Sequence, residues 1–336
     1  MPGVPATGSR SSNGKNTVRL SKVVTSLLIE KGFHVSVYKE PVPRKRYCFN
    51  ITAKRGDKFL LIKCVERLER FTSQLASELK ITSFTFGSTP LVVALKDSDG
   101  KPLLEGILYK KYKVFGVEPS TLRILLEERG IYIYADKGGF HVKINGKKLR
   151  KLRERLNLSL GEVAEAVGVS RKAIYEYERG NLGSTPEVAV RLEELLGGSI
   201  VKPINIFEET HYRKESDVQY RIARSHLRKM PTQLHEVFSK EIGDKIKLLR
   251  QAPFEIIVNK DKRPLIVKLL LNLRRKREQL KELEYSIDFS KMADAQLVLV
   301  SNKASSYEIK KSEINSDELL MLSPEDAKEL KELLEE

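Results

Sequence analysis

The stretch VGVSRKAIYEYERG, residues 167–180, fixes the geometry of the middle of the chain more tightly than any other. Gly168 permits a tight turn between two short helices, Ser170 is a preferred helix-capping residue, and Gly180 is a preferred helix-terminating residue. Ser159, followed by Glu162 three positions later, has the form of a capping box that starts the helix before the turn. The pattern predicts two short helices held at a fixed angle.

The apolar residues around this stretch predict a shared core. In KKLRKLRERL (147–156) the leucines fall on one face of a helix with a dense basic face opposite, and Ala164 is small enough to let the next two helices cross closely. The residues expected to point inward are Leu149, Leu152, Leu156, Val169, Ile174 and Tyr177. The side chains left on the outer surface of the last helix are Arg171, Lys172, Tyr175 and Glu176.

The motifs LRKLRERLNLS and VAEAVGVSRKAIYEYERG together resemble the helix-turn-helix domain of the lambda-repressor and Cro type, the Xre family, and in particular its long archaeal members. In that family the third helix lies in the major groove, where each base pair displays a distinct set of donors and acceptors. The resemblance implies a recognition helix at 170–179, with Arg171, Lys172 and Glu176 at base-contacting positions. Arg or Lys suits guanine O6 and N7, and Glu176 suits cytosine N4.

Contacts to the DNA backbone follow from the same resemblance. Ser170 matches a position near the backbone, and Tyr175 is open between a phosphate or thymine contact and packing on the helix surface. Leu160 stands where the family often has a glutamine that holds a phosphate, and Leu cannot donate. Arg153 and Glu178 match an ion pair that ties the first helix to the third. The expected substitutes for the glutamine, unless they form only a solvated face, are Lys147, Lys148, Arg150 and Lys151.

Two distant segments of the chain repeat one another. FNITAKRGDKFLLIK (49–63) and FEIIVNKDKRPLIVK (254–268) both begin at Phe, end at Lys and have apolar residues at matching places. Each is followed by a charged helical pattern and then by an apolar strand, PLVVALKDS (90–98) or AQLVLVSNKA (295–304). Three ordered elements at nearly equal spacing predict two copies of one small α/β fold.

The first copy resembles the PD-(D/E)XK nuclease fold, in which one strand carries an Asp and the next carries Glu-x-Lys. Those carboxylates hold the metal ion that activates water. Matching the strands puts Asn50 at the Asp position, Leu61 at the Glu position and Lys63 at the Lys position. The resemblance therefore implies the fold without the metal site.

The second copy also lacks the pair of carboxylates that would hold a metal ion. Its corresponding residues are Glu255, Ile266 and Lys268, and a single carboxylate is too little charge to hold a divalent ion. We therefore expect no catalytic residue and no metal site in either copy.

The whole chain is expected to be an α+β multidomain protein, with a central all-α helix-turn-helix domain between two small α/β nuclease-like domains. The expected segments are a disordered tail (1–16), a degenerate nuclease-like domain (17–130), a hairpin connector (131–146), the helix-turn-helix domain (147–200), a linker (201–216), a helical segment with the second nuclease-like copy (217–316) and an acidic C-terminal helix (317–336).

The charge balance favours a polyanionic partner. The chain has 61 Lys and Arg against 45 Asp and Glu, a formal net charge of +16. Residues 1–140 contain 24 basic and 13 acidic residues and so carry most of the excess. Their sharpest basic cluster is Arg44, Lys45 and Arg46 beside Tyr47, which is either a backbone-binding patch or a solvated loop.

Hydropathy and cysteine content bound the cellular setting. No apolar run approaches the roughly 20 residues that span a bilayer, and the N-terminal stretch lacks the apolar centre of a signal peptide, so we expect a cytoplasmic protein with no membrane partner.

Cys48 and Cys64 flank a predicted hairpin. We expect two buried reduced thiols, with a disulfide as the alternative if the source is a hyperthermophile.

These patterns favour a sequence-specific DNA-binding transcriptional regulator over an enzyme. Its expected partner is double-stranded DNA, read by a homodimer at paired half-sites, with no cofactor and with any small-molecule effector left open. The flanking domains would bind the DNA backbone or dimerise, and the near-neutral second copy suits dimerisation. The alternatives are an RNA- or ribosome-associated bridging protein, and an active nuclease that uses Lys63.

Overall fold

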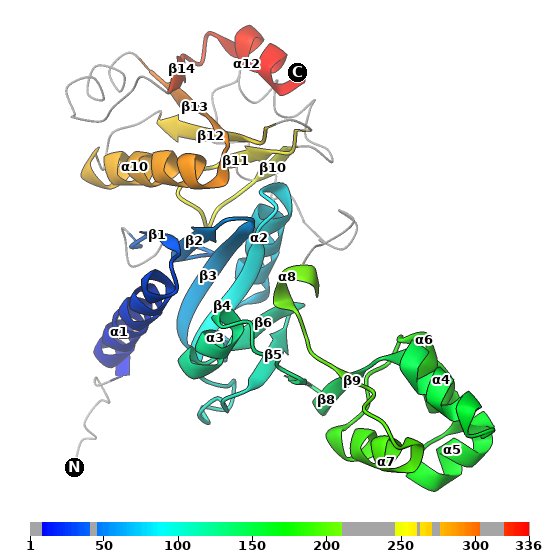
Figure 1. Cartoon of the computed structure of the whole chain (residues 1–336). Coiled ribbons are helices and arrows are strands. Elements are labelled where there is room, and N and C mark those ends of the chain that lie inside the picture. Colours follow the sequence, from blue (N-terminus) through cyan, green and yellow to red (C-terminus); the bar gives the residue numbers. More distant parts are fainter. Residues whose placement is uncertain are drawn as a thin grey trace, which may run out of the picture. The chain divides into compact units, whose positions relative to one another are not determined.

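The chain folds into two compact units (Figure 1). Unit 1 combines residues from both ends of the chain, and unit 2 lies between them in sequence. The boundaries are 1–64, 71–91 and 210–336 for unit 1, and 65–70 and 92–209 for unit 2. The computed structural model describes residues 9–40, 46–209, 246–260, 263–270, 276–302 and 319–335.

The N-terminal copy of the repeated fold is a sheet with strand order β1-β2-β3-β4, in which β1 pairs with β2 and β2 with β3 in antiparallel register. The turn between β2 and β3 contains Gly56, whose φ of 58° suits glycine. The elements of this region are α1 (Ser9–Glu30), β1 (His34–Val37), β2 (Ile51–Arg55), β3 (Lys58–Arg67), α2 (Ser73–Thr85) and β4 (Thr89–Lys96).

Two helices of this region begin elsewhere than the sequence predicts. α1 starts at Ser9, inside the expected tail. The helix that the charged pattern after residue 63 predicts starts only at Ser73, because β3 continues to Arg67 and a 3-10 turn, Leu68–Arg70, follows it. Thr72 then caps α2, since its Oγ1 accepts a hydrogen bond from the Leu75 N–H at 3.3 Å.

The C-terminal copy has the strand order β10-β11-β12-β13-β14, with β10 to β12 antiparallel and β12 to β14 parallel. The expected helical pattern up to residue 250 is wrong for β10, while residues 210–245 lie outside the described part. Within the segment expected to hold the acidic C-terminal helix (317–336), β14 comes first, and α12 begins at Ala327, shortly after Ser323 and Pro324, which the sequence predicts to start that helix. The elements are β10 (Ile246–Leu248), β11 (Ile256–Val258), β12 (Leu265–Leu270), α10 (Lys276–Ala293), β13 (Gln296–Ser301), β14 (Leu320–Leu322) and α12 (Ala327–Glu335).

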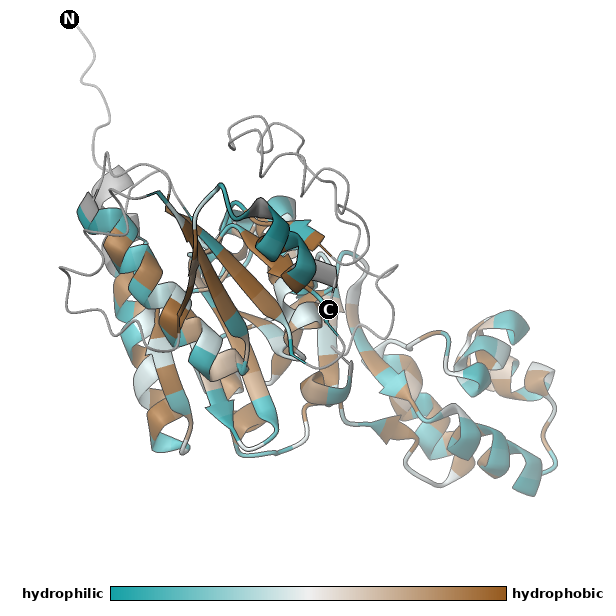
Figure 2. Cartoon of the chain, turned by 90° about the horizontal axis from the view of Figure 1, so that it is seen from above, coloured by the Kyte–Doolittle hydropathy of each residue, from teal (hydrophilic) through white to brown (hydrophobic). Residues whose placement is uncertain are grey.

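The two copies pair their central strands in the same register. Ile51 pairs with Ile62 in the first copy, and Ile256 pairs with Val267 in the second, so each residue has its counterpart 205 positions later. The strands in both sheets are rich in apolar residues, which Figure 2 shows in brown. A shared register is what a duplicated fold requires, because a slip of one residue would turn every side chain to the opposite face.

A side-chain hydrogen bond also recurs at equivalent positions. The Cys64 N–H donates to Asn50 Oδ1 at 3.1 Å, and 205 positions later the Leu269 N–H donates to Glu255 Oε2 at 2.9 Å. The position expected to hold a metal-binding carboxylate therefore serves the backbone of the neighbouring strand in both copies.

Within unit 1 the two copies exchange contacts through their helices. Glu78 of α2 accepts hydrogen bonds from the backbone N–H groups of Arg250 and Gln251, which follow β10, at 2.9 and 2.7 Å. In the other direction, Tyr285 of α10 accepts from the backbone N–H of Lys39, which follows β1, at 3.1 Å. Each helix thus holds the chain just after the first strand of the other copy.

An aromatic cluster fills the same contact. Phe289 of α10 is buried, and its ring contacts rings from both copies at centroid distances of 4.9 to 6.5 Å. Its partners are Tyr38, Phe49, Phe59, Phe86 and Phe254. Aromatic side chains bury large apolar areas, so this cluster stabilises the association of the two copies.

Unit 2 continues the strand order β4-β6-β5-β7-β8-β9 and inserts four helices between β8 and β9. β9 pairs with the end of β8, although its residues fall in the expected linker. The elements are β5 (Ile107–Lys111), β6 (Val114–Val117), α3 (Pro119–Leu126), β7 (Ile133–Asp136), β8 (Gly139–Ile144), α4 (Gly146–Arg155), α5 (Leu160–Val167), α6 (Arg171–Arg179), α7 (Pro186–Leu196), β9 (Val201–Lys202) and α8 (Ile206–Glu209).

Cys48 and Cys64 are buried free thiols. Burial raises the pKa of Cys64 to about 12, and it raises the pKa of Cys48 well above the usual range. Both groups are therefore protonated and poorly reactive at neutral pH. In the part of the chain that the structure describes, no helix has the length and apolar character needed to cross a membrane.

Candidate nucleic-acid interface

Helices α5 and α6 are joined by the turn that the sequence predicts. Ser159 and Glu162 form the complete capping box at the start of α5, Gly168 ends α5 at a φ of 71°, and Ser170 caps α6 by accepting from the Ala173 N–H at 3.1 Å. Gly180 ends α6 at a φ of 72°. Left-handed backbone at both glycines sets the direction of the chain before and after α6.

The core under these helices is built largely from the expected residues. Leu149, Leu152, Ile174 and Tyr177 are buried, whereas Leu156 is 43% exposed because α4 ends at Arg155. The hairpin before α4 also enters this core. Its contributors from β8 are Val142 and Ile144.

The first residue of α4 approaches the end of α6 very closely. A Cβ atom at Gly146 would lie 2.4 Å from the Tyr177 carbonyl oxygen and still closer to that of Glu178. Only glycine fits such a contact with backbone, so Gly146 fixes where α4 meets α6. Sequence reasoning missed this residue, because the contact joins segments far apart in the chain.

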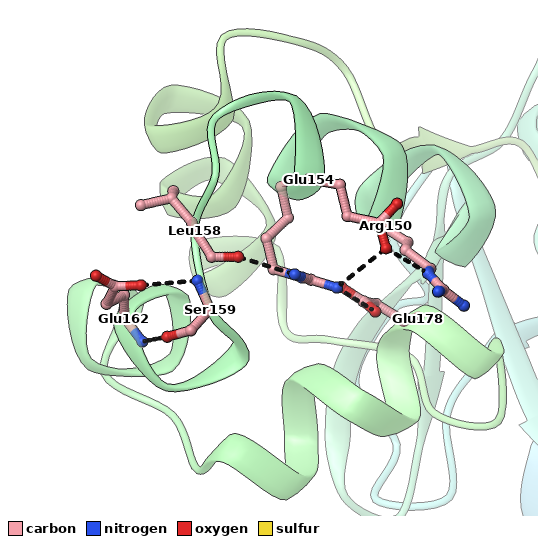
Figure 3. A network of polar contacts seen from close by, with 7 residues as sticks. Arg150, Glu154, Leu158, Ser159, Glu162 and Glu178 are labelled. Carbon is pink, nitrogen blue, oxygen red and sulfur yellow. Dashed lines mark hydrogen bonds and ion pairs between the residues drawn. The ribbon is translucent and has the colours of Figure 1, made fainter.

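An ion pair ties α4 to α6, as the family resemblance implies. Arg153 donates from Nε and Nη2 to the carboxylate of Glu178 at 2.6 and 3.1 Å, and from Nη1 to the Leu158 carbonyl at 2.8 Å (Figure 3). The two side chains are only 12% and 9% exposed. Hydrogen bonding to Glu178 raises the pKa of Arg153. Both residues therefore serve the fold.

The outer surface of α6 carries the side chains predicted to read bases. Arg171 and Lys172 are exposed, and among the described residues no carboxylate pairs with either of them. Glu176 is half-buried and accepts a hydrogen bond from Asn181 Nδ2 at 2.8 Å. Tyr175 is 45% exposed, and its hydroxyl accepts from Arg179 Nη1 at 3.2 Å. Sequence reasoning assigned no role to Arg179 and Asn181.

The residues predicted to contact the backbone differ in their surroundings. Lys147, Lys148 and Lys151 are exposed on α4. Arg150 is exposed too, but its Nε donates to Glu154 one turn later at 2.7 Å, as Figure 3 shows. Ser170 uses its hydroxyl oxygen to cap α6. Arg46 is exposed, and the rest of the expected basic patch, Arg44 and Lys45, lies outside the described residues.

The nuclease-like position of the N-terminal copy does not offer the ligands of a metal ion. Asn50 uses its Oδ1 for the Cys64 N–H, and Leu61 is fully buried. The Lys63 ammonium group donates to Glu40 at 2.8 Å and to the Tyr47 carbonyl at 2.6 Å. A divalent ion needs several oxygen ligands, and these residues leave one carboxylate, which is already paired.

In the C-terminal copy a lysine lies where carboxylates converge. Lys268 is 1% exposed, and its Nζ is 2.9 Å from both Glu255 and Glu282. Burial alone would lower the pKa of Lys268, but the two carboxylates outweigh burial and raise it. Its ammonium group therefore fills the position between them. Within the described ranges no group of three or more His, Cys, Asp or Glu side chains is arranged to hold a metal ion.

A hydrogen bond joins this buried group to the other copy. The Tyr47 hydroxyl donates to Glu282 at 3.1 Å, and burial together with the Glu282 charge raises the pKa of Tyr47. Because the Tyr47 carbonyl also accepts from Lys63, the groups around Lys63 and Lys268 are linked through one polar network in unit 1.

Comparison with known proteins identifies both kinds of domain. A family model described as a PD-(D/E)XK superfamily domain matches residues 17–131, and one described as helix-turn-helix matches residues 149–202.

Relatives in archaea cover most of the chain. One from Thermococcus kodakarensis is 30% identical over 332 residues, which is 94% of this chain and 98% of the relative. Another from Methanocaldococcus jannaschii is 33% identical over 234 residues, 70% of this chain and 71% of the relative, and one from Pyrococcus horikoshii is 30% identical over 293 residues, 86% and 88%. The name of each relative describes it as a proposed HTH-type transcriptional regulatory protein.

Proposed function

This chain belongs to the archaeal family of HTH-type transcriptional regulatory proteins that combine a PD-(D/E)XK domain with a helix-turn-helix of the Xre type, and on that premise we propose that it reads the sequence of double-stranded DNA through α6. The recognition helix, 170–179, enters the major groove. Arg171 and Lys172 donate to guanine O6 and N7, and Glu176 accepts from an exocyclic amino group such as cytosine N4.

One observation carries this proposal. The inner face of α6, with Ile174 and Tyr177, is buried in the helix-turn-helix core, so the opposite face presents Arg171 and Lys172 to solvent without an acidic partner among the described residues. Unpaired donors on a rigid helix can form hydrogen bonds to bases without first breaking an internal ion pair. The helix backbone that carries these side chains is already ordered, which lowers the entropy lost on binding.

The DNA backbone would be held by groups around this helix. Lys147, Lys148 and Lys151 supply charge from α4, Arg150 supplies less because Glu154 neutralises it, and Ser170 and Tyr175 contribute hydroxyl groups. In the N-terminal domain the exposed Arg46 would add charge for phosphates, and Arg44 and Lys45 of the predicted basic patch lie outside the described residues.

We assign the nuclease-like copies to binding and dimerisation, and not to catalysis. Asn50, Leu61 and Ile266 replace the metal-binding carboxylates, and Lys63 and Lys268 are held in ion pairs. A homodimer would place two recognition helices on half-sites about one helical turn apart. Because α10 of the C-terminal copy already packs on the N-terminal copy, the surface for a second chain would have to lie elsewhere on that copy.

Selection of bound sequences from a random duplex pool tests the function. We expect the wild-type chain to enrich one sequence, with two-fold symmetry if it binds as a dimer. The double variant Arg171→Ala/Lys172→Ala should bind duplex DNA without enriching that sequence. A matched control, Lys101→Ala/Lys137→Ala, removes two exposed lysines of unit 2 and should keep it. Equal enrichment by the double variant and the control would contradict base reading by α6.

The net charge of +16 also suits an RNA- or ribosome-associated bridging protein. Retention of the full chain on duplex DNA, structured RNA and ribosomal subunits, each at the same salt concentration, separates the two functions. Preferred retention on RNA or subunits, with no enriched duplex, would favour the second one.

A further inference from the structure

The end of α6 folds back on its own last turn. Gly180 adopts left-handed backbone, and the backbone N–H of the next residue, Asn181, then donates to the Glu176 carbonyl at 3.0 Å. Nothing lies within 4 Å of a Cβ placed on Gly180, so its backbone conformation and not crowding favours glycine there. This turn brings the exposed side chain of Asn181 beside the reading surface.

Asn181 binds one side of the Glu176 carboxylate. Its Nδ2 donates to Oε2 at 2.8 Å, which leaves Oε1 to accept from another donor. The donor is a neutral amide, so the carboxylate keeps its negative charge. A glutamate side chain loses rotamer entropy when it is fixed, and the hydrogen bond from Asn181 restricts Glu176 before DNA binds.

The nearby cation of α6 is held away from this carboxylate. The guanidinium of Arg179 lies over the Tyr175 ring, 5.4 Å from its centroid, and donates to the Tyr175 hydroxyl. Among the described residues Glu176 forms no ion pair with Lys or Arg. The acceptor oxygen is therefore not used by a basic neighbour.

We infer that Asn181 is a specificity-determining positioning residue: it orients Glu176 so that one carboxylate oxygen faces the amino group of a single base, cytosine N4 or adenine N6. This inference rests on the proposed function, in which α6 reads bases. Glu176 contacts the base, and Asn181 acts through it. The Asn181 amide thereby increases the preference of Glu176 for one base pair of the DNA site. Arg171 and Lys172 read the remaining base pairs.

A double-mutant cycle on the full chain tests this role. Asn181→Leu has nearly the same size as the wild-type residue and removes the donor, while its backbone N–H still closes the turn. In the site enriched by the wild-type chain, we expect this variant to lose roughly tenfold of the preference at one base pair and to keep the others. In a Glu176→Ala background the same substitution should change that preference by less than about twofold, because its effect passes through Glu176.

One further variant and two contrary outcomes separate this role from a direct contact of Asn181 with DNA. Asn181→Gln keeps a donor amide and should restore part of the preference, and thermal unfolding of all variants should be unchanged, since the residue is exposed. An equal loss in both backgrounds would overturn the inference, because Asn181 would then contact DNA itself. A preference unaffected by Asn181→Leu would overturn it as well. If the wild-type chain enriches no sequence, the proposed function itself is wrong, which is a different result from a loss of the role of Asn181.

Discussion

At the scale of single residues, the surface of α6 that we propose to read DNA depends on residues that hold the helix in place. Arg153 and Glu178 hold α4 to α6, Gly146 lets the two helices approach, and Asn181 donates a hydrogen bond to Glu176. Side chains that pack or pair inside the domain leave the exposed residues of α6 in fixed directions. Base reading needs such fixed directions because hydrogen bonds to base edges are directional.

Gly146→Ala should destabilise the helix-turn-helix domain. The added Cβ would overlap the carbonyl oxygens of Tyr177 and Glu178, and backbone must shift to make room. Overpacking of this kind costs about 1–3 kcal/mol in the free energy of unfolding, measurable by chemical denaturation. The matched control is Gly161→Ala in α5, where the nearest atom is 3.7 Å away and we expect equal or slightly higher stability. Equal stability of the two variants would show that α4 and α6 do not meet as described.

At the scale of helices and strands, α4 is the element that supplies charge beside α6. In the proposed function its exposed Lys147 and Lys148 would replace the phosphate anchor that Leu160 cannot provide. Each lysine that binds a phosphate releases counterions from the DNA, and this release makes binding sensitive to salt.

Neutralising these lysines should flatten the salt dependence of binding. For Lys147→Gln/Lys148→Gln we expect the slope of log affinity against log salt to fall by roughly 0.9 for each lost phosphate contact, with the selected sequence unchanged. Binding titrations at four or more salt concentrations measure the slope. Lys101→Gln/Lys137→Gln removes the same charge elsewhere in unit 2 and should leave the slope nearer that of the wild type. Identical slopes for the two double variants would rule out α4 as a phosphate anchor.

Helix α2 holds the C-terminal copy through one buried carboxylate. Glu78→Ala would leave the backbone N–H groups of Arg250 and Gln251 without their acceptor, at a cost of about 1–3 kcal/mol in the stability of unit 1. Glu78→Gln keeps a carbonyl acceptor and should lose less. A larger loss for Gln than for Ala in chemical denaturation would contradict the assignment.

The same residue predicts a pH dependence. Burial raises the pKa of Glu78 above 4.5, although hydrogen bonds from Gln251 and Arg250 oppose the rise. The folded state therefore holds the proton more tightly than the unfolded state. The stability contributed by protonated Glu78 is present below pH 4.5 and is lost as the pH rises through the raised pKa. As the pH rises through the raised pKa, the free energy of unfolding of the wild-type chain should fall relative to that of Glu78→Gln. A difference between the two free energies that does not change with pH would contradict the raised pKa.

At the scale of the whole molecule, local signals were readable in the sequence and long-range contacts were not. The caps at Ser159, Gly168 and Ser170 act over three or four residues, so their pattern predicted the turn before α6. The β5–β6 hairpin was missed, because Tyr112 and Lys113 adopt positive φ in its turn where Asn or Gly would be expected.

The matching apolar patterns predicted two similar sheets, but the contacts between those sheets could not be predicted from the sequence. The sequence could not predict that Glu282 accepts hydrogen bonds from Lys268 and Tyr47, since these residues come from separate segments that only folding brings together. The sequence shows Asn50 and Leu61 at the positions matched to metal-binding carboxylates, whereas the position of Lys268 between Glu255 and Glu282 required the structure.

The central claim is that α6 reads base edges. The most direct test replaces a single ring atom of guanine in the DNA. In the enriched duplex, replacing a guanine by 7-deazaguanine removes the N7 acceptor from the major groove and leaves Watson–Crick pairing intact. We expect at least one such replacement to weaken the wild-type chain by roughly tenfold and to leave Arg171→Ala/Lys172→Ala unaffected. If every replacement weakens both chains equally, or neither chain, α6 does not read the major groove.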